Sequence, residues 1–222
     1  MEETIRQIAI WALPILMAIV FHEVAHGWVA FRLGDPTAAR MGRLTLNPIS
    51  HIDLFGTVLL PLLLIVAHSP FLFGYAKPVP VNFNNLNHPK RDMIWVALAG
   101  PMTNILLAFG SVLVLKFLLS LNFSPDSSLS SFFLTVLTPL ALMAQNSVRI
   151  NVLLAVFNIF PIPPLDGGRV LVGLLPEPYS STLARVEPYG IVVLMVLLFT
   201  GVVHVIIGPI IHFLLAMFHG ML

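Results

Sequence analysis

The chain has 222 residues, of which 58% are hydrophobic and only 9% are charged. Because an average soluble domain carries about 25% charged residues, this composition excludes a water-soluble globular protein and indicates an integral membrane protein. A formal net charge of +1 without any basic run gives no footprint for nucleic acid. The absence of cysteine excludes disulfides and thiolate ligands, so any metal site must use histidine and carboxylate.

The first hydrophobic stretch, residues 5–33, is long enough to cross about 30 Å of hydrocarbon. Inside it lies His22-Glu23-Val24-Ala25-His26, an H-E-x-x-H pattern. Residues four apart share one helix face, so two imidazoles can reach one zinc ion while Glu23 lies nearby to take a proton from water. A zinc motif within a membrane span indicates an enzyme that works inside the bilayer.

Three further long apolar stretches, residues 92–121, 132–160 and 189–218, are each predicted to cross the membrane as one helix. Residues 54–69 would give about 24 Å of helix, so this stretch is either a short span or a re-entrant segment. Basic residues on both sides of it favour re-entry.

Two segments are expected to be extended. Residues 40–46 alternate weakly in polarity, and residues 76–81 contain Pro78 and Pro80, which forbid helix. Since no repeat or linker divides the chain, we predict one domain over residues 1–222. The predicted fold is an all-α polytopic bundle of about four to six transmembrane segments, with short extended or β segments near the active site.

The distribution of charge predicts an orientation. Lys77, Lys90 and Arg91 make residues 70–91 basic, whereas the loop at residues 122–131 carries only Asp126. The positive-inside rule places the basic segment in the cytoplasm. We therefore expect a multi-pass protein of the cell membrane with its active site toward the cytoplasmic side.

Two histidines do not complete a catalytic zinc site, which usually takes three protein ligands and a water. No acid follows His26 before Asp35, and most other acids lie at predicted span ends or in loops, where water solvates them: Asp53, Asp92, Asp126, Glu177 and Glu187. Asp166 differs, because it follows a long apolar helix directly and precedes another apolar piece.

The backbone around Asp166 is predicted to be broken. Pro161, Pro163 and Pro164 cannot continue a helix, and the glycines after Asp166 allow a sharp turn. Irregular backbone at membrane depth is tolerated only where it is buried in protein or lines a wet cavity. Asp166 is thus the candidate third ligand; the alternative is an interfacial loop in which it caps the next helix.

The two motifs together, residues 22–26 and residues 158–168, resemble the site-2 protease family of intramembrane zinc metalloproteases. Residues 42–48 (GRLTLNP), 76–82 (AKPVPVN) and 100–104 (GPMTN) fit that family as well. The resemblance implies one zinc ion per chain, held by His22, His26 and Asp166, with Glu23 as general base. No space between the predicted spans accommodates the PDZ-like domain of some relatives.

The resemblance also implies regulated intramembrane proteolysis: hydrolysis of peptide bonds within or near transmembrane segments of membrane-anchored proteins, such as an anti-sigma factor or a remnant signal peptide. The expected partners are a transmembrane protein or peptide substrate and membrane lipids, without nucleic acid. Asn104 and Asn158 are candidates to stabilise the oxyanion or hold the unwound substrate. The alternative is that these amides bridge helices.

Other functional classes fit the sequence less well than a protease. A metal transporter also places His and Asp in broken helices, but it needs no general base between two ligands, and the chain shows no inverted repeat. A scaffolding protein has no use for the motif. The spacing of His204, His212 and His219 brings them toward one side of the last helix, but without a carboxylate between them we expect packing or interfacial roles.

Overall fold

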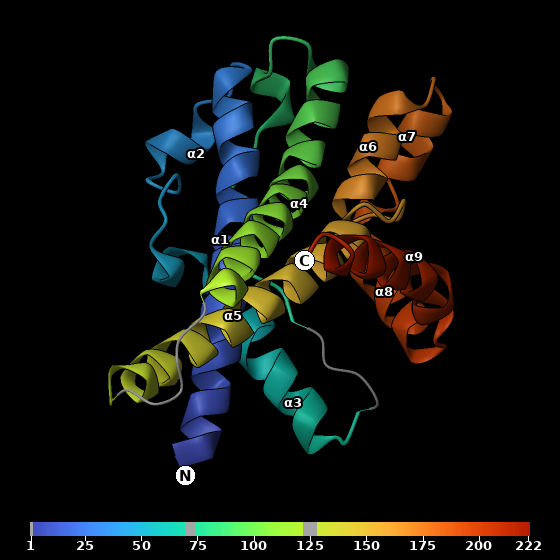
Figure 1. Ribbon diagram of the computed structural model, residues 1–222. Helices are drawn as coiled ribbons and strands as arrows, with labels where there is room; N and C mark the ends of the chain where they lie inside the picture. Colours follow the sequence, from blue (N-terminus) through green and yellow to red (C-terminus); the bar gives the residue numbers. More distant parts are fainter. Residues whose placement is uncertain (1, 70–73, 122–127) are drawn as a thin grey trace.

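The computed structural model describes residues 2–69, 74–121 and 128–222, and the helices dominate it (Figure 1). In chain order the elements are α1 (Glu2–Arg32), α2 (Thr37–Arg40), η1 (Pro48–His51), η2 (Leu54–Leu59), α3 (Leu60–Val66), η3 (Phe83–Asn85), α4 (Pro89–Ser120), α5 (Ser128–Asn158), α6 (Asp166–Leu174), α7 (Tyr179–Ala184), η4 (Glu187–Tyr189), α8 (Gly190–Phe199) and α9 (Val202–His219). The predicted helical membrane fold is confirmed.

Five helical runs in the described residues are long and apolar enough to cross a membrane: Arg6–Arg32, Pro89–Ser120, Thr135–Asn158, Tyr179–Phe199 and Val202–His219. This agrees with the predicted four to six spans. The single span predicted over residues 189–218 is wrong, because the helix breaks at Gly201, whose φ of 76° lies in the left-handed region. Glycine adopts this conformation without steric cost, and the long apolar stretches that begin on either side of Thr200-Gly201 hide the turn in the sequence.

Helices α1, α4 and α5 pack against one another, and α6 packs on α4. Helices α8 and α9 lie to one side, with α9 against α5 (Figure 1). A cluster of small and branched residues, including Val112, Val148, Val152 and Val203, fills the space between α4, α5 and α9. Long helices in mutual contact give the rigid elements on which a site can be built.

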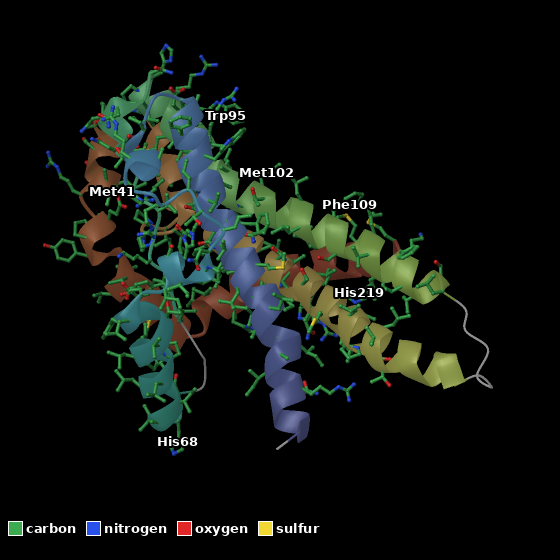
Figure 2. The ribbon with its side chains drawn as sticks, turned by 90° about the vertical axis from the view of Figure 1, so that its left-hand side faces the viewer. Met41, His68, Trp95, Met102, Phe109 and His219 are labelled. Carbon is green, nitrogen blue, oxygen red and sulfur yellow. The ribbon has the colours of Figure 1, made fainter. Side chains whose placement is uncertain are left out.

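Helix α4 has two contrasting faces. Trp95, Met102 and Phe109, spaced by seven residues, are exposed and follow its outer side (Figure 2). The opposite face buries Gly100 and Asn104 against the other helices. Residues seven apart lie on one side of a helix, so the apolar outer stripe is suited to lipid while the inner face is suited to a site.

The segment predicted to re-enter the membrane forms a six-residue π-helix, η2, followed by the seven-residue α3. Together they give about 20 Å of helix at 1.5 Å per residue, which is too short to cross. The Asp53 side chain accepts a hydrogen bond from the Gly56 N–H and starts the run. Helix α3 extends toward the end of the molecule where α1 begins (Figure 1). The sequence favoured a re-entrant segment over a full crossing, and this geometry agrees with that prediction.

The described residues contain no β-strand, so the predicted β segments near the site are not found. Pro78 and Pro80 lack the N–H groups that a ladder needs. Other elements take the remaining groups: Lys77 N–H donates to the His51 carbonyl at 2.9 Å, and Arg43 Nη2 donates to the Lys77 carbonyl at 3.0 Å. Side chains and loops hold this segment in place of strand pairing. Asp126, used in the orientation argument, lies outside the described residues.

Candidate metal centre

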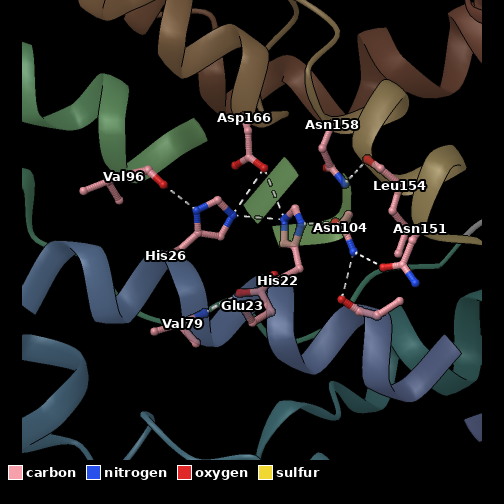
Figure 3. A network of polar contacts seen from close by, with 11 residues as sticks. His22, Glu23, His26, Val79, Val96, Asn104, Asn151, Leu154, Asn158 and Asp166 are labelled. Carbon is pink, nitrogen blue, oxygen red and sulfur yellow. Dashed lines mark hydrogen bonds and ion pairs between the residues drawn. The ribbon is translucent and has the colours of Figure 1, made fainter. Parts of the chain in front are cut away.

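Helix α1 carries both histidines of the motif on one face. His22 and His26 are buried, and their Nε2 atoms lie 3.0 Å apart. Each ring is held from behind through Nδ1: that of His22 lies 2.6 Å from Asn104 Oδ1, and that of His26 lies 2.7 Å from the Val96 carbonyl (Figure 3). Because both anchoring groups belong to α4, the packing of α1 on α4 sets the direction of the two imidazoles.

Asp166 reaches the same point from the first turn of α6. Its Oδ2 atom lies 3.2 Å from His22 Nε2 and 3.3 Å from His26 Nε2. A Cβ on Gly167 would overlap the carbonyl of Ile159, so only glycine permits this close return of the chain after α5. The N-cap of α6 is Leu165, which makes no side-chain cap bond. Asp166 therefore lies inside the helix, and the alternative in which it caps α6 is not what the structure shows.

The three facing atoms are all hydrogen-bond acceptors. The Val96 carbonyl accepts only, so a neutral His26, the form that binds metals, donates from Nδ1 and presents a lone pair at Nε2. The Oδ2 atom of Asp166 is buried without a hydrogen-bond partner. A carboxylate oxygen facing nitrogen lone pairs is a donor set for a cation.

The spacing fits zinc. Ligands at about 2.0–2.1 Å in a tetrahedral zinc site lie about 3.3 Å from one another. The ligand atoms of His22, His26 and Asp166 lie at 3.0, 3.2 and 3.3 Å, and among the described residues this is the group of His, Cys, Asp or Glu that could hold a metal ion.

Gly100 forms the side of the site that α4 contributes. A Cβ at this position would lie 2.6 Å from His22 Nε2 and closer still to His26 Nε2. The missing side chain therefore leaves the space in front of both nitrogens free. The sequence placed Gly100 in a family-like motif without assigning it a role.

Glu23 lies beside the two histidines on α1, and its Oε2 atom accepts a hydrogen bond from the Val79 N–H at 2.8 Å (Figure 3). Val79 belongs to the proline-bearing segment after α3, which packs closely on α1: a Cβ on Gly27 would overlap its side chain. This contact fixes one carboxylate oxygen of Glu23. The other oxygen has no hydrogen-bond partner within the described part of the chain, which suits a group that accepts a proton.

The two candidate asparagines differ in their surroundings. Asn104 is fully buried at the centre of the bundle, with its carbonyl on His22 and its amino group on Ala18 and Asn151. Asn158 ends α5, and its amino group donates back to the Leu154 carbonyl at 2.9 Å (Figure 3). The structure thus brings Asn104 into contact with a candidate ligand, whereas Asn158 bonds within its own helix.

An H-E-x-x-H helix and a distant aspartate that meet inside an apolar helical bundle define a membrane metalloprotease. The model of Peptidase family M50 matches residues 10–201. "Putative zinc metalloprotease YwhC" of Bacillus subtilis (strain 168) is 35% identical over 200 residues, which cover 90% of this chain and 84% of that protein.

"Putative zinc metalloprotease Rip2" of Mycolicibacterium smegmatis is 29% identical over 185 residues, covering 83% of this chain and 64% of that protein. Rip2 of Mycobacterium tuberculosis (strain H37Rv) is 31% identical over 182 residues, covering 82% and 63%. The chain thus spans less than two thirds of the Rip2 proteins. No solved structure matches.

The chain belongs to Peptidase family M50, the site-2 protease family. The predicted resemblance is confirmed, and the protein is a multi-pass membrane zinc metalloprotease. This membership decides against the metal transporter and the scaffold.

Proposed function

We propose that this protein hydrolyses peptide bonds within or near transmembrane segments of membrane-anchored proteins, as in regulated intramembrane proteolysis. The depth of the metal group carries the proposal. His22 and His26 lie within the span Arg6–Arg32, ten and six residues from its end. At 1.5 Å per residue these positions are about 15 Å and 9 Å along the helix from Arg32, below the surface of the bilayer.

In this proposal His22, His26 and Asp166 hold one zinc ion, which when bound supplies a Lewis acid and a water of lowered pKa. Glu23 accepts the proton of the attacking water through its unbonded oxygen and returns it to the leaving amine. The Val79 N–H holds the other oxygen, so the carboxylate keeps one direction during both transfers. Asp166 and the histidines keep their direction through the rigid contacts of α1, α4 and α6.

Asn158 is proposed to donate to the oxyanion or to the unwound substrate. Its amino group donates to the Leu154 carbonyl, one turn back in α5. When the Asn158 side chain turns toward the substrate, that carbonyl can be satisfied by a helical or solvent partner, and the amino group is free to donate to the oxyanion. Asn104 is less suited to this role, since both of its amide protons are engaged in the bundle.

The site is proposed to open toward the cytoplasm. The end of α1 nearest to the metal group, at Arg32, adjoins the start of α4, where Lys90 and Arg91 lie (Figure 1). Positive charge at these ends favours the cytoplasmic side. Since the natural chain has no cysteine, a single cysteine placed at Lys90 tests this: it should be labelled by an impermeant thiol reagent only after the cells are opened. Labelling in intact cells would reverse the orientation.

The catalytic assignment is tested with purified protein in detergent, by measuring bound zinc and cleavage of a transmembrane-helix substrate. Glu23→Gln should keep zinc and lose cleavage by at least about 100-fold, the lower end of the range for general bases. Asp166→Ala should lose both zinc and cleavage. His212→Ala, an exposed histidine on α9, is the matched control and should change neither. Cleavage that persists without the Glu23 carboxylate would refute the assignment.

A further inference from the structure

A chain of buried amides runs from the metal group into the bundle. Asn104 on α4 contacts His22, and its amino group donates to Asn151 Oδ1 on α5 at 2.8 Å (Figure 3). Only 1% of Asn151 is exposed and none of Asn104. A buried polar group left unpaired costs about 1–3 kcal/mol, so each member of such a chain constrains the direction of the next.

The direction of the Asn104 amide follows from its partners. Its Nδ2 atom lies 3.1 Å from the Ala18 carbonyl, which can only accept. The amino group must therefore face Ala18, and the carbonyl oxygen must face His22. A carbonyl oxygen only accepts, so His22 donates from Nδ1 and presents the lone pair of Nε2 toward Asp166.

The direction of the Asn151 amide is fixed in the same way. Its amino group donates to the Ser147 carbonyl at 2.8 Å and to the Ser147 hydroxyl at 3.1 Å. Its carbonyl oxygen is thereby turned to the amino group of Asn104. The hydroxyl of Ser147 lies 2.7 Å from that of Ser111, which lies 2.7 Å from the Leu107 carbonyl and ends the chain on α4.

We infer that Asn151 is a positioning residue for the metal site: it holds the Asn104 amide so that His22 keeps its proton on Nδ1 and offers Nε2 to zinc. Metal-ligating histidines commonly donate their other N–H to a fixed acceptor, and loss of such partners costs about 10–100-fold in metal affinity. The inference rests on the proposed role of His22 as a ligand. It gives α5 a part in the site besides carrying Asn158.

The test is the zinc affinity of purified protein in detergent, measured by competition with a fluorescent chelator. Asn151→Leu has a similar shape but no acceptor, and it should weaken zinc binding about 10–100-fold. Asn146→Leu is the matched control. Asn146 is also buried on α5 but is not a member of the hydrogen-bonded series that runs from His22 to Ser111, so the zinc affinity of this variant should stay within about 2-fold. Asn151→Asp keeps an oxygen toward Asn104 and should retain most of the affinity.

Asn151→Ala should reproduce the loss if leucine prevents folding. The same titration of Asp166→Ala separates this inference from the proposed function. Zinc held normally by Asp166→Ala would overturn the ligand assignment and the inference with it. Zinc lost there but held normally by both apolar variants of Asn151 would overturn the inference alone. Equal losses in Asn151→Leu and Asn146→Leu would show that buried amides on α5 matter only for packing.

Discussion

Histidines occur in apolar helices in two regions of this molecule, with opposite surroundings. In α1, His22 and His26 are buried, and each has its Nδ1 anchored by α4 and its Nε2 facing Asp166 from α6. In α9, His204 and His212 are exposed, and His219 bonds through Nδ1 to the Leu215 carbonyl of its own helix.

The difference shows what turns a histidine in a membrane helix into part of a site. Spacing along one helix brings two side chains to one face in both regions. Within the part of the chain that the structure describes, only in the first region do other elements supply an acceptor behind each ring and a carboxylate in front. Convergence of several elements, which requires tertiary packing, separates a metal group from a row of exposed histidines.

The largest effect is expected from Gly100→Ala, which places a methyl group in front of both Nε2 atoms without changing any ligand. Bound zinc and cleavage should fall by at least about 100-fold, because three rigid helices cannot part to admit the methyl group. Gly110→Ala is the matched control on α4: a Cβ there meets nothing within 4 Å. Full zinc content in Gly100→Ala would show that the metal lies elsewhere.

The second prediction concerns the packing of α8, the helix before α9, on the turn that leads to the metal group. Gly190, the first residue of α8, packs so closely on the turn before α6 that a Cβ would overlap the carbonyl of Pro163. Gly190→Ala should lower the free energy of unfolding by about 1–3 kcal/mol, as overpacking does, and should weaken zinc binding by shifting the turn that leads to Asp166.

Gly208→Ala in α9 is the comparison for this variant, since its Cβ meets only the ring of His204 at 3.9 Å or more. Thermal unfolding in detergent and zinc titration measure both effects. A Gly190→Ala protein as stable as Gly208→Ala, with unchanged zinc affinity, would mean that α8 does not support the site.

The sequence was sufficient to predict the membrane class and the three members of the metal group. His22, Glu23 and His26 follow from a local pattern, and Asp166 follows from prolines and glycines that break the backbone after an apolar helix. These signals are local, because they depend on residues within one or two turns. The structure places all four residues together, and their roles remain predictions that the proposed experiments test.

The partners of these residues were not predictable in the same way. Val96 and Asn151 lie 70 and 129 positions after His26 and His22, and no periodicity in the sequence pairs them. The same holds for Gly100, whose role is to lack a side chain at a point where two helices meet. The break at Gly201 was missed because one glycine within a long, largely apolar stretch is also compatible with a continuous helix.

A smaller effect is expected from Asp35, which joins the end of α1 to the segment before α4. Its buried carboxylate accepts hydrogen bonds from the N–H groups of Thr37 and Asn82 and from Asn85 Nδ2, at 3.1, 2.7 and 2.9 Å. Burial raises the pKa of Asp35, but these bonds lower it more, so its pKa lies below the usual value. Asp35→Asn should cost about 1–3 kcal/mol of stability at neutral pH.

The sign of the pH dependence follows from this lowered pKa. The contribution of Asp35 is complete above the ordinary aspartate pKa of about 3.9 and is lost as the pH falls through the lower native value. Thermal unfolding of zinc-free protein should therefore show a smaller loss of stability in acid for Asp35→Asn than for the natural chain. Glu187→Gln, at a carboxylate that is more than a third exposed, serves as the control. Parallel acid curves would contradict this account.

The smallest effect is expected from the ion pair between α6 and η4, the short helix that precedes α8. Arg169, one turn after Asp166, donates from Nε and Nη2 to Glu187 Oε1, and its guanidinium lies over the ring of Phe83. Both charged side chains are more than a third exposed, so salt and water screen the pair to about 0–1 kcal/mol. Glu187→Gln, which leaves the arginine over the ring, and Arg169→Gln should both keep zinc affinity within about 2-fold. A tenfold loss in both variants would mean that this ion pair, rather than the backbone contact at Gly190, holds the start of α6 against the histidines.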